Sequence, residues 1–365
     1  MDSTSIRTCQ NAAQKLMGYP WKLWFWGDSA GLEGLIRAAE LTGDPACWDY
    51  VYGLLKGWSA RSEPRRMFDH TAAGQALIES YRKYKDPALL EAALRLAEYL
   101  SAFRRLPNGC PVHYEDAHIE LPPELPEDHP QYDPELESVR QELRTDSAGP
   151  CVFVDSMHFQ APFFAHLFEV TGDGRYKDEA FATLSGQMEL VWDDDACLFH
   201  HFWIERQGKP NGVHWGRGQG WAMLGIIETL KVFKNDSGFL DKFVPVLNQL
   251  FQSMVRYQHS SGDWHTVVDA PDAYLESSVA AFFVKGYAEA KLSGWLEVEY
   301  DQAFEKAWAA MWKHAKEDGR FLGVSFETFP SLNVEHYKQM PVNAIVPWGH
   351  GPFLSACEAY SRLKR

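Results

Sequence analysis

The stretch W-G-D-S-A-G-L, residues 26–32, is the first of six similar helix starts along the 365-residue chain. Each start has an aromatic or aliphatic residue, then polar or glycine residues, and then apolar residues at helical spacing. The other five begin at Phe68, Val154, Trp215, Leu275 and Trp348. Recurring units of this kind cannot bury their apolar faces alone, so they are expected to pack against one another in one larger structure.

The spacing of apolar residues and helix breakers predicts twelve helices. Segment 28–41 has one apolar face and ends at T-G-D-P (42–45), where Gly43 suits a C-terminal cap and Pro45 fits the next first turn. Shorter helices with Gly and Ala alternate with longer ones, which predicts an all-α, closed ring of six helical hairpins with an inner and an outer layer. The expected helices are 5–17, 28–41, 45–58, 69–84, 87–103, 156–170, 175–191, 219–234, 238–257, 276–291, 297–315 and 350–363.

The repeat favours a single domain over residues 1–365, closed by pairing of the first helix with the last. One insertion interrupts it around 114–146, where P-P-E-L-P-E-D-H-P-Q-Y-D-P-E (122–135) is rich in proline and acid. Long loops inside a compact domain are usually functional or mobile, so we expect a lid or rim, with a plain solvated loop as the alternative.

The composition narrows the possible partners. A formal net charge of −15 argues against nucleic acid. No apolar run approaches the about 20 residues of a membrane span, and the start M-D-S-T-S-I-R-T lacks the basic and apolar regions of a signal peptide. We therefore expect a cytoplasmic protein without membrane contact, and its oligomeric state stays open. The 14 Trp residues either stack on sugars or fill a large core.

Polar residues occupy nearly equivalent places near the six helix starts: Asp28, Asp69, Asp155, Arg217, Glu276 and His350. In a closed ring these side chains converge at one end. Asp69 and Asp155 are the leading pair, because two neighbouring carboxylates perturb each other's pKa and can share general acid and base work. The alternative is that each carboxylate only caps its helix.

The stretch W-G-R-G-Q-G-W, residues 215–221, is the strongest local motif. Its glycines allow close backbone approach, and the planar fork of Arg217 matches a carboxylate. The alternative is a glycine-rich turn with a surface arginine. His201, in L-F-H-H-F-W (198–203), is a further candidate, although a lone histidine is more often structural.

We expect neither a metal nor an organic cofactor. The six cysteines are scattered without a C-x-x-C pair, which favours free thiols. Neither H-E-x-x-H, a catalytic-serine elbow nor a phosphate loop occurs, and the dispersed acidic residues do not form a metal-ligand pattern.

Five motifs in order resemble glycoside hydrolase family 105 and its relative family 88, the unsaturated uronyl hydrolases. They are F-D-H (68–70), V-D-S-M-H-F-Q-A-P-F-F-A (154–165), L-F-H-H-F-W (198–203), W-G-R-G-Q-G-W (215–221) and G-H-G-P-F-L-S-A (349–356). The resemblance implies an (α/α)6 barrel, with Asp155 as acid/base and Asp69 as its assistant. It also implies a set of substrate-binding residues: Trp26, His70, His201, Trp215, Arg217, Trp221 and His350.

The implied substrate is an oligosaccharide whose non-reducing uronic acid carries a C4=C5 double bond. The enzyme would hydrate this enol ether and release the neighbouring sugar without a cofactor. Three alternatives remain: an ordinary two-carboxylate glycosidase, a sugar epimerase that uses a histidine pair, and a non-catalytic carbohydrate-binding barrel.

Two positions depart from the family pattern. The family commonly carries a histidine shortly before its V-D motif, but 145–153 has none, and His113 and His158 are the candidates to replace it. Gln219 stands where the family often has asparagine. Both departures concern the identity of the substrate more than the reaction.

Overall fold

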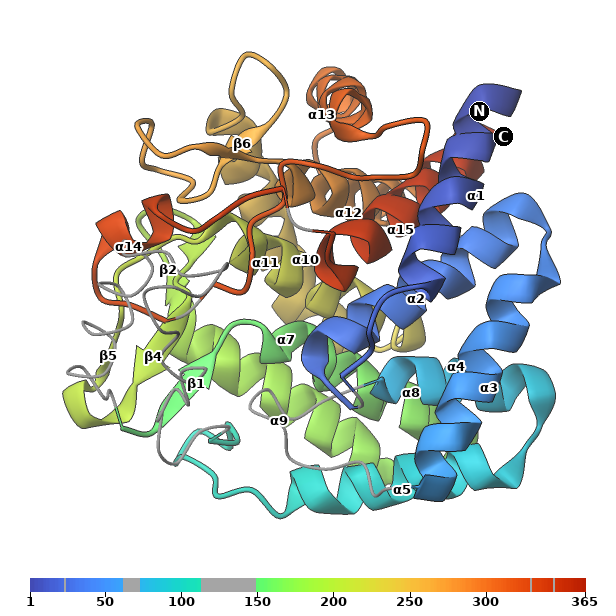
Figure 1. Ribbon diagram of the computed structural model, residues 1–365. Coiled ribbons are helices and arrows are strands. Elements are labelled where there is room, and N and C mark those ends of the chain that lie inside the picture. The colour runs from blue at the N-terminus through green and yellow to red at the C-terminus, as the bar shows by residue number, and fades with distance from the viewer. Residues whose placement is uncertain (23, 62–72, 113–148, 329, 344) are drawn as a thin grey trace, which may run out of the picture.

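Two concentric rings of helices form the molecule (Figure 1). The computed structural model describes residues 1–22, 24–61, 73–112, 149–328, 330–343 and 345–365. Each inner element contacts the next, and the last contacts the first, so the inner ring is closed. Its described members are α2 (Trp26–Thr42), α4 (Gly74–Tyr84), the pair α7 (Ser156–Phe159) and α8 (Ala161–Thr171), α10 (Gly216–Val232), α12 (Ser277–Ser293) and α15 (Pro347–Leu363).

The outer ring covers the inner one. Each outer helix contacts the inner helix next to it along the chain, and α1 contacts both α2 and α15. The two chain ends therefore lie side by side (Figure 1). This arrangement confirms the predicted (α/α)6 barrel. The outer helices are α1 (Ser3–Met17), α3 (Pro45–Arg61), α5 (Pro87–Ser101), α9 (Gly174–Val191), α11 (Ser237–Arg256) and α13 (Asp301–His314).

Glycine lets the inner helices approach closely where the ring closes. A Cβ on Gly351 of α15 would lie 2.0 Å from the carbonyl oxygen of Ala30 in α2, and one on Gly34 would lie 2.3 Å from the Cα of Gly351. Similarly, a Cβ on Gly225 of α10 would lie 2.3 Å from the Met157 carbonyl oxygen. No other residue fits at these contacts without a backbone shift.

Several helix boundaries differ from the prediction. The expected helix 156–170 is interrupted at Gln160 because Pro162 lacks an N–H and is confined to the start of α8. Helix α13 begins at Asp301 rather than at 297, and the backbone N–H of Tyr300, just before it, donates to the Tyr287 hydroxyl. Helices α10 and α15 begin three residues earlier than expected, so Arg217 and His350 lie inside their first turns.

Short strands lie in the connections that lead into the inner helices. Strands β1 (Cys151–Phe153), β4 (Phe202–Ile204) and β5 (Lys209–Pro210) form one antiparallel sheet. Two smaller sheets pair β2 (Trp192–Asp193) with β3 (Leu198–Phe199), and β6 (Trp264–His265) with β7 (Leu275–Glu276). The short helix α14 (Val334–Lys338) lies in the long connection before α15. Because they precede inner helices, these segments lie at the end of the barrel where the inner helices begin.

The predicted insertion at 114–146 lies outside the described residues. Within the described ranges, every helix is too short or too polar to cross a lipid bilayer.

Candidate active site

The register of one strand pair brings Asp155 beside His201. Strand β1 runs antiparallel to β4, with Phe153 opposite Phe202. One residue further along, the backbone N–H of Val154 donates to the carbonyl oxygen of His201 at 2.9 Å. The chain then turns into α7, and the Asp155 carboxylate reaches the imidazole, with Oδ2 3.6 Å from Nε2 of His201. Two residues 46 positions apart thus become neighbours through backbone pairing.

The carboxylate of Asp155 does not cap its helix. Its backbone is already in the helical region, and its side chain makes no capping hydrogen bond. The side chain is only 16% exposed, and Oδ2 is buried without a hydrogen bond to any described residue. A buried, unsatisfied carboxylate oxygen is costly for stability unless a ligand uses it. The N-cap interpretation therefore does not explain Asp155.

A hydrogen-bond chain supports His201 from the side opposite Asp155. Nδ1 of His201 lies 2.6 Å from the hydroxyl of Tyr337, which also accepts from the amide Nδ2 of Asn211 at 3.2 Å. Burial raises the pKa of Tyr337, so its hydroxyl stays protonated. When this hydroxyl donates to Nδ1 of a neutral imidazole, the single N–H of the ring is on Nε2 and faces Asp155. Asp155, His201, Tyr337 and Asn211 are called the Asp155 network below.

Trp215 and Arg217 stand next to this network. The Trp215 ring lies 4.4 Å from the His201 ring, and the Arg217 guanidinium lies 4.7 Å from the Trp215 ring. Trp215 is 2% exposed, and its indole N–H has no hydrogen-bond partner among the described residues. This N–H is therefore a second unsatisfied polar group near the carboxylate.

Arg217 is buried and bound to the protein itself. Nη1 donates to the Ser325 hydroxyl at 2.8 Å and lies 3.4 Å from Glu276 Oε1, while Nη2 donates to the Phe326 carbonyl and the Thr328 hydroxyl, both at 3.0 Å. The surface-turn alternative is wrong for this residue, because its side chain is 0% exposed. The guanidinium fork, which we expected to meet a substrate carboxylate, holds the segment 325–328.

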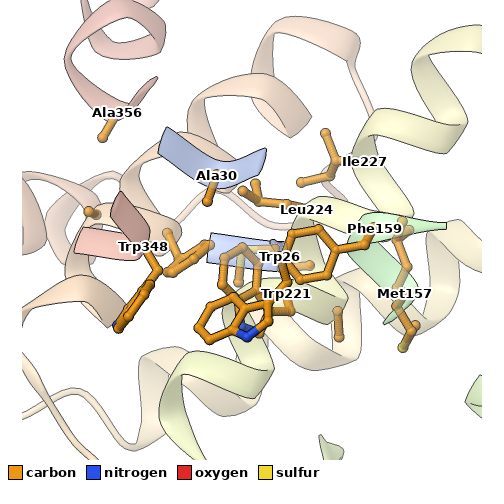
Figure 2. Close-up of a cluster of buried hydrophobic side chains, with 14 of the residues drawn as sticks. Trp26, Ala30, Met157, Phe159, Trp221, Leu224, Ile227, Trp348 and Ala356 are labelled. Atoms are coloured by element: carbon orange, nitrogen blue, oxygen red, sulfur yellow. The ribbon is translucent and has the colours of Figure 1, made fainter. Parts of the chain in front are cut away.

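Trp26 and Trp221 belong to a buried aromatic cluster formed by residues of four inner elements, α2, α7, α10 and α15. Figure 2 shows their rings together with those of Phe159 and Trp348. Ring centroids are 4.7 Å apart for Trp26 and Trp348, 5.0 Å for Phe159 and Trp221, and 6.4 Å for Trp26 and Trp221. All four are at most 8% exposed. Trp26 and Trp348 lie in the first turns of α2 and α15, and Trp26 is the most exposed member of the cluster.

His350 points into the protein. It is 0% exposed, and its Nε2 accepts the backbone N–H of Phe321 at 3.2 Å. Burial lowers its pKa to about 4. His350 and the Asp155 network are thus not brought into contact, although both lie near the starts of inner helices.

The remaining sequence-based candidates separate into two groups. Asp69 and His70 lie outside the described residues, as does His113. His158 is 2% exposed; its Nε2 lies 3.0 Å from Glu33 Oε2, and its ring stacks on Trp221 at 5.2 Å.

The departure at Gln219 has a structural role, because its side chain donates to the Phe199 carbonyl and accepts the Phe199 N–H. It therefore ties β3 to α10.

A polar cavity of about 290 Å³ lies farther along the inner helices. Glu33 and His158 border it, and residues of all the inner helices, many of them charged, line the rest. Most of these charges are paired, as in the contact of Arg82 with Glu169. Asp155 does not line this cavity, so we assign the chemistry to the Asp155 network rather than to the cavity.

The sequence reasoning missed Tyr337 and Asn211. Both lie in connections, Tyr337 in the short α14 and Asn211 just after β5. A lone tyrosine or asparagine in a connection carries no local signal, because its function depends on the fold that returns it to His201.

Comparison with known proteins identifies the family of this chain. The profile of Glycosyl Hydrolase Family 88 matches residues 2–364. The unsaturated rhamnogalacturonyl hydrolase YesR of Bacillus subtilis (strain 168) is 28% identical over 335 residues, which cover 90% of this chain and 87% of that protein.

Two solved structures share the fold. A possible member of the GH105 family from Salmonella enterica subsp. enterica serovar Paratyphi A superposes with a TM-score of 0.80 at 21% identity, covering 98% of this chain and 93% of that one. The unsaturated glucuronyl hydrolase of Bacillus sp. GL1 superposes with a TM-score of 0.68 at 15% identity, covering 98% and 96%. With its closed double ring of helices and its nearly full-length profile match, the chain belongs to glycosyl hydrolase family 88.

Proposed function

We propose that this glycoside hydrolase removes the 4,5-unsaturated uronic acid from the non-reducing end of lyase-generated oligosaccharides. The family and the relatives named above support this class of substrate. The observation that carries the proposal is the Asp155 carboxylate, whose Oδ2 is buried, lacks a hydrogen bond to the described residues and lies 3.6 Å from His201. Such a carboxyl group can hold a proton, donate it and recover it.

The chemistry needs one group that acts first as an acid and then as a base. Protonated Asp155 donates to C4 of the enol ether, which leaves an oxocarbenium ion across C5 and the ring oxygen. The Asp155 carboxylate then takes a proton from the water that adds to C5. The C5–ring oxygen bond breaks to leave a ketone at C5, and the resulting hemiacetal at C1 releases the neighbouring sugar.

The other residues are assigned by their surroundings. His201, held by Tyr337, would orient the water or a substrate hydroxyl next to Asp155. The indole N–H of Trp215 would meet a polar group of the substrate, and Trp26 and Trp221 would form the floor beneath the sugar. Arg217 and His350 are enclosed by protein, so we propose that they position the site rather than touch the sugar.

Asp69 and His70 keep the roles that the family resemblance implies. Asp69 would assist Asp155 by holding substrate hydroxyls or water, and His70 would bind substrate. The closure of the inner ring by α2 and α15, from opposite ends of the chain, supports the proposal that residues 1–365 act as a single catalytic domain.

The test uses the ultraviolet absorbance of the C4=C5 double bond. Lyase digests of pectin, rhamnogalacturonan, ulvan, xanthan and glycosaminoglycans are each incubated with the enzyme. We expect the absorbance of at least one digest to disappear, with release of one sugar per double bond lost. Matched saturated oligosaccharides serve as controls, and their cleavage at a comparable rate would instead indicate an ordinary two-carboxylate glycosidase.

A further inference from the structure

A second cluster of ionisable side chains lies beside the Asp155 network but does not belong to it. Asp193 is the last residue of β2, His200 follows β3, and His214 precedes the start of α10. Oδ2 of Asp193 lies 3.2 Å from Nε2 of His214 and 3.5 Å from Nε2 of His200. The two imidazole rings are stacked, with centroids 4.6 Å apart and planes inclined by 18°. One donor atom of each residue lies within 4.8 Å of the others.

Hydrogen bonds from outside the cluster fix two of these side chains. Oδ1 of Asp193 accepts the backbone N–H groups of Asp195 and Ala196 at 2.9 and 3.1 Å, so its other oxygen is left to face the histidines. Nδ1 of His214 lies 2.8 Å from Oδ2 of Asp269. A carboxylate on one imidazole nitrogen directs the lone pair of the other nitrogen outward, which is the usual outer-shell arrangement around a metal-binding histidine.

Nε2 of His214, the nitrogen whose lone pair points outward, has no hydrogen bond to the described residues. The side chain is 7% exposed, and Nε2 is buried without a hydrogen-bond partner among the described residues, although Asp193 lies near it. A buried polar atom of this kind is uncommon in a folded protein and calls for an explanation. An ion held between Nε2 and the Asp193 carboxylate supplies one.

We propose that Asp193, His200 and His214 bind a divalent transition-metal ion of the Zn²⁺ type. Two imidazole nitrogens and one carboxylate oxygen are a ligand set that suits Zn²⁺, whose bonds to these atoms are about 2.0–2.2 Å long. Ligand atoms this far from one metal lie about 3–3.5 Å apart, so the pairs at 3.2 and 3.5 Å need little movement. Asp193 is 25% exposed, which leaves room for water as a fourth ligand.

At this position the ion would hold together three segments next to the Asp155 network. It would join β2, the turn after β3 and the segment before α10, which are three separate pieces of the chain. His200 immediately precedes His201, and His214 immediately precedes Trp215. A bound ion would therefore restrain the backbone that carries two residues next to Asp155. This role is independent of the sugar that the enzyme cleaves.

The direct test is Zn²⁺ binding to the full chain after treatment with a chelator. We expect titration calorimetry at pH 7.5 to show one Zn²⁺ per chain, and Co²⁺ to bind at the same stoichiometry. Replacing a ligand, as in His200→Ala or His214→Ala, should weaken binding at least about 100-fold. Asp269→Asn, which changes the carboxylate that holds His214, should weaken binding about 10- to 100-fold. A matched control is His259→Ala, which removes an exposed histidine elsewhere and should bind as the wild type does.

Two further measurements keep the test decisive. Bound Zn²⁺ should raise the Tm of the wild type by mass action but not that of the ligand variants, and circular dichroism at low temperature checks that each variant is folded. Cys197, a half-buried thiol in the same connection, is tested by Cys197→Ser, which should leave Zn²⁺ affinity unchanged. The proposal is overturned if the wild type binds no Zn²⁺, if Asp269→Asn and His214→Ala both bind as tightly as the wild type, or if Cys197→Ser abolishes binding.

Discussion

At the scale of single residues, two aspartates that precede helices behave differently. Asp173 accepts the backbone N–H of Arg175 at 3.0 Å and caps α9. Asp155 precedes α7, makes no such bond, and keeps a buried oxygen without a hydrogen bond to the described residues. The sequence position alone therefore does not decide whether an aspartate is structural, whereas the missing capping bond separates the two.

This contrast predicts different effects of the same substitution. Asp155→Asn should lower kcat roughly 10²- to 10⁴-fold, because the amide can neither donate nor recover the proton. It should fold normally, because the carboxylate makes no capping bond that could be lost. Turnover is followed by loss of double-bond absorbance, and folding by circular dichroism.

The matched control for this prediction is Asp173→Asn, which should keep wild-type kcat because asparagine caps a helix about as well as aspartate. A folded Asp155→Asn enzyme with wild-type turnover would contradict the assignment of Asp155 as the acid/base.

Arg217 carries the second prediction at this scale. A lysine cannot reproduce the planar fork that reaches Ser325, Phe326 and Thr328. We expect Arg217→Lys to lower the free energy of unfolding by about 1–3 kcal/mol, because buried partners lose their hydrogen bonds. The measurement is urea denaturation, together with kcat and KM.

Arg320→Lys is the control for Arg217→Lys, because Arg320 is a half-exposed arginine paired with Asp318 at the surface. Its free energy of unfolding should change by less than about 1 kcal/mol. A large rise in KM for Arg217→Lys with wild-type stability would contradict this expectation and indicate that Arg217 contacts the substrate directly.

At the scale of helices, ring closure depends on the glycines between α2 and α15. Gly351→Ala would place a Cβ 2.0 Å from the Ala30 carbonyl oxygen, so one helix must move. We expect a loss of about 1–3 kcal/mol or more in the free energy of unfolding, as for other overpacked cores. Denaturation by urea measures it.

Gly57 provides the comparison for Gly351 within the same molecule. It lies inside the outer helix α3, and a Cβ there would meet nothing within 4 Å. Gly57→Ala should therefore stabilise the protein by about 0.4–1 kcal/mol. Equal effects of the two substitutions would show that helix propensity, rather than the close approach, explains the glycine at 351.

At the scale of the whole molecule, we expect the buried His350 to make the folded protein less stable at acidic pH. Burial lowers the pKa of His350 from 6.5 to about 4, so the unfolded chain binds a proton at a higher pH than the folded one. Full stability is present above pH 6.5 and is lost as the pH falls toward 4. The free energy of unfolding lost through protonation of His350 approaches about 3 kcal/mol.

Thermal unfolding measured between pH 7.5 and 4.5 tests this expectation. The wild-type Tm should fall steadily below about pH 6.5. His350→Gln, which can still accept the Phe321 N–H, should show a lower Tm at pH 7.5 but a shallower fall with acid. A parallel pH dependence in the two proteins would contradict a contribution from His350.

The helical hairpins, their closure into an (α/α)6 barrel and the resemblance to the family could be predicted from local patterns in the sequence. Helical periodicity, caps and breakers are local, so each segment such as 28–41 carries its own evidence. The break in the predicted helix 156–170 has a local cause too, because Pro162 lacks a backbone N–H and fits only the start of α8.

Which side chains meet could not be predicted from the sequence, because it depends on the folded chain. Three hydrogen-bond acceptors of Arg217 lie more than 100 residues away, in the segment 325–328, and Tyr337 lies 136 residues from His201. The three ligands of the proposed metal site come from separate connections and show no metal-binding motif in sequence. The physical reason is that a short window encodes helical period, whereas contacts at the barrel mouth depend on strand register and on connections that return across the ring.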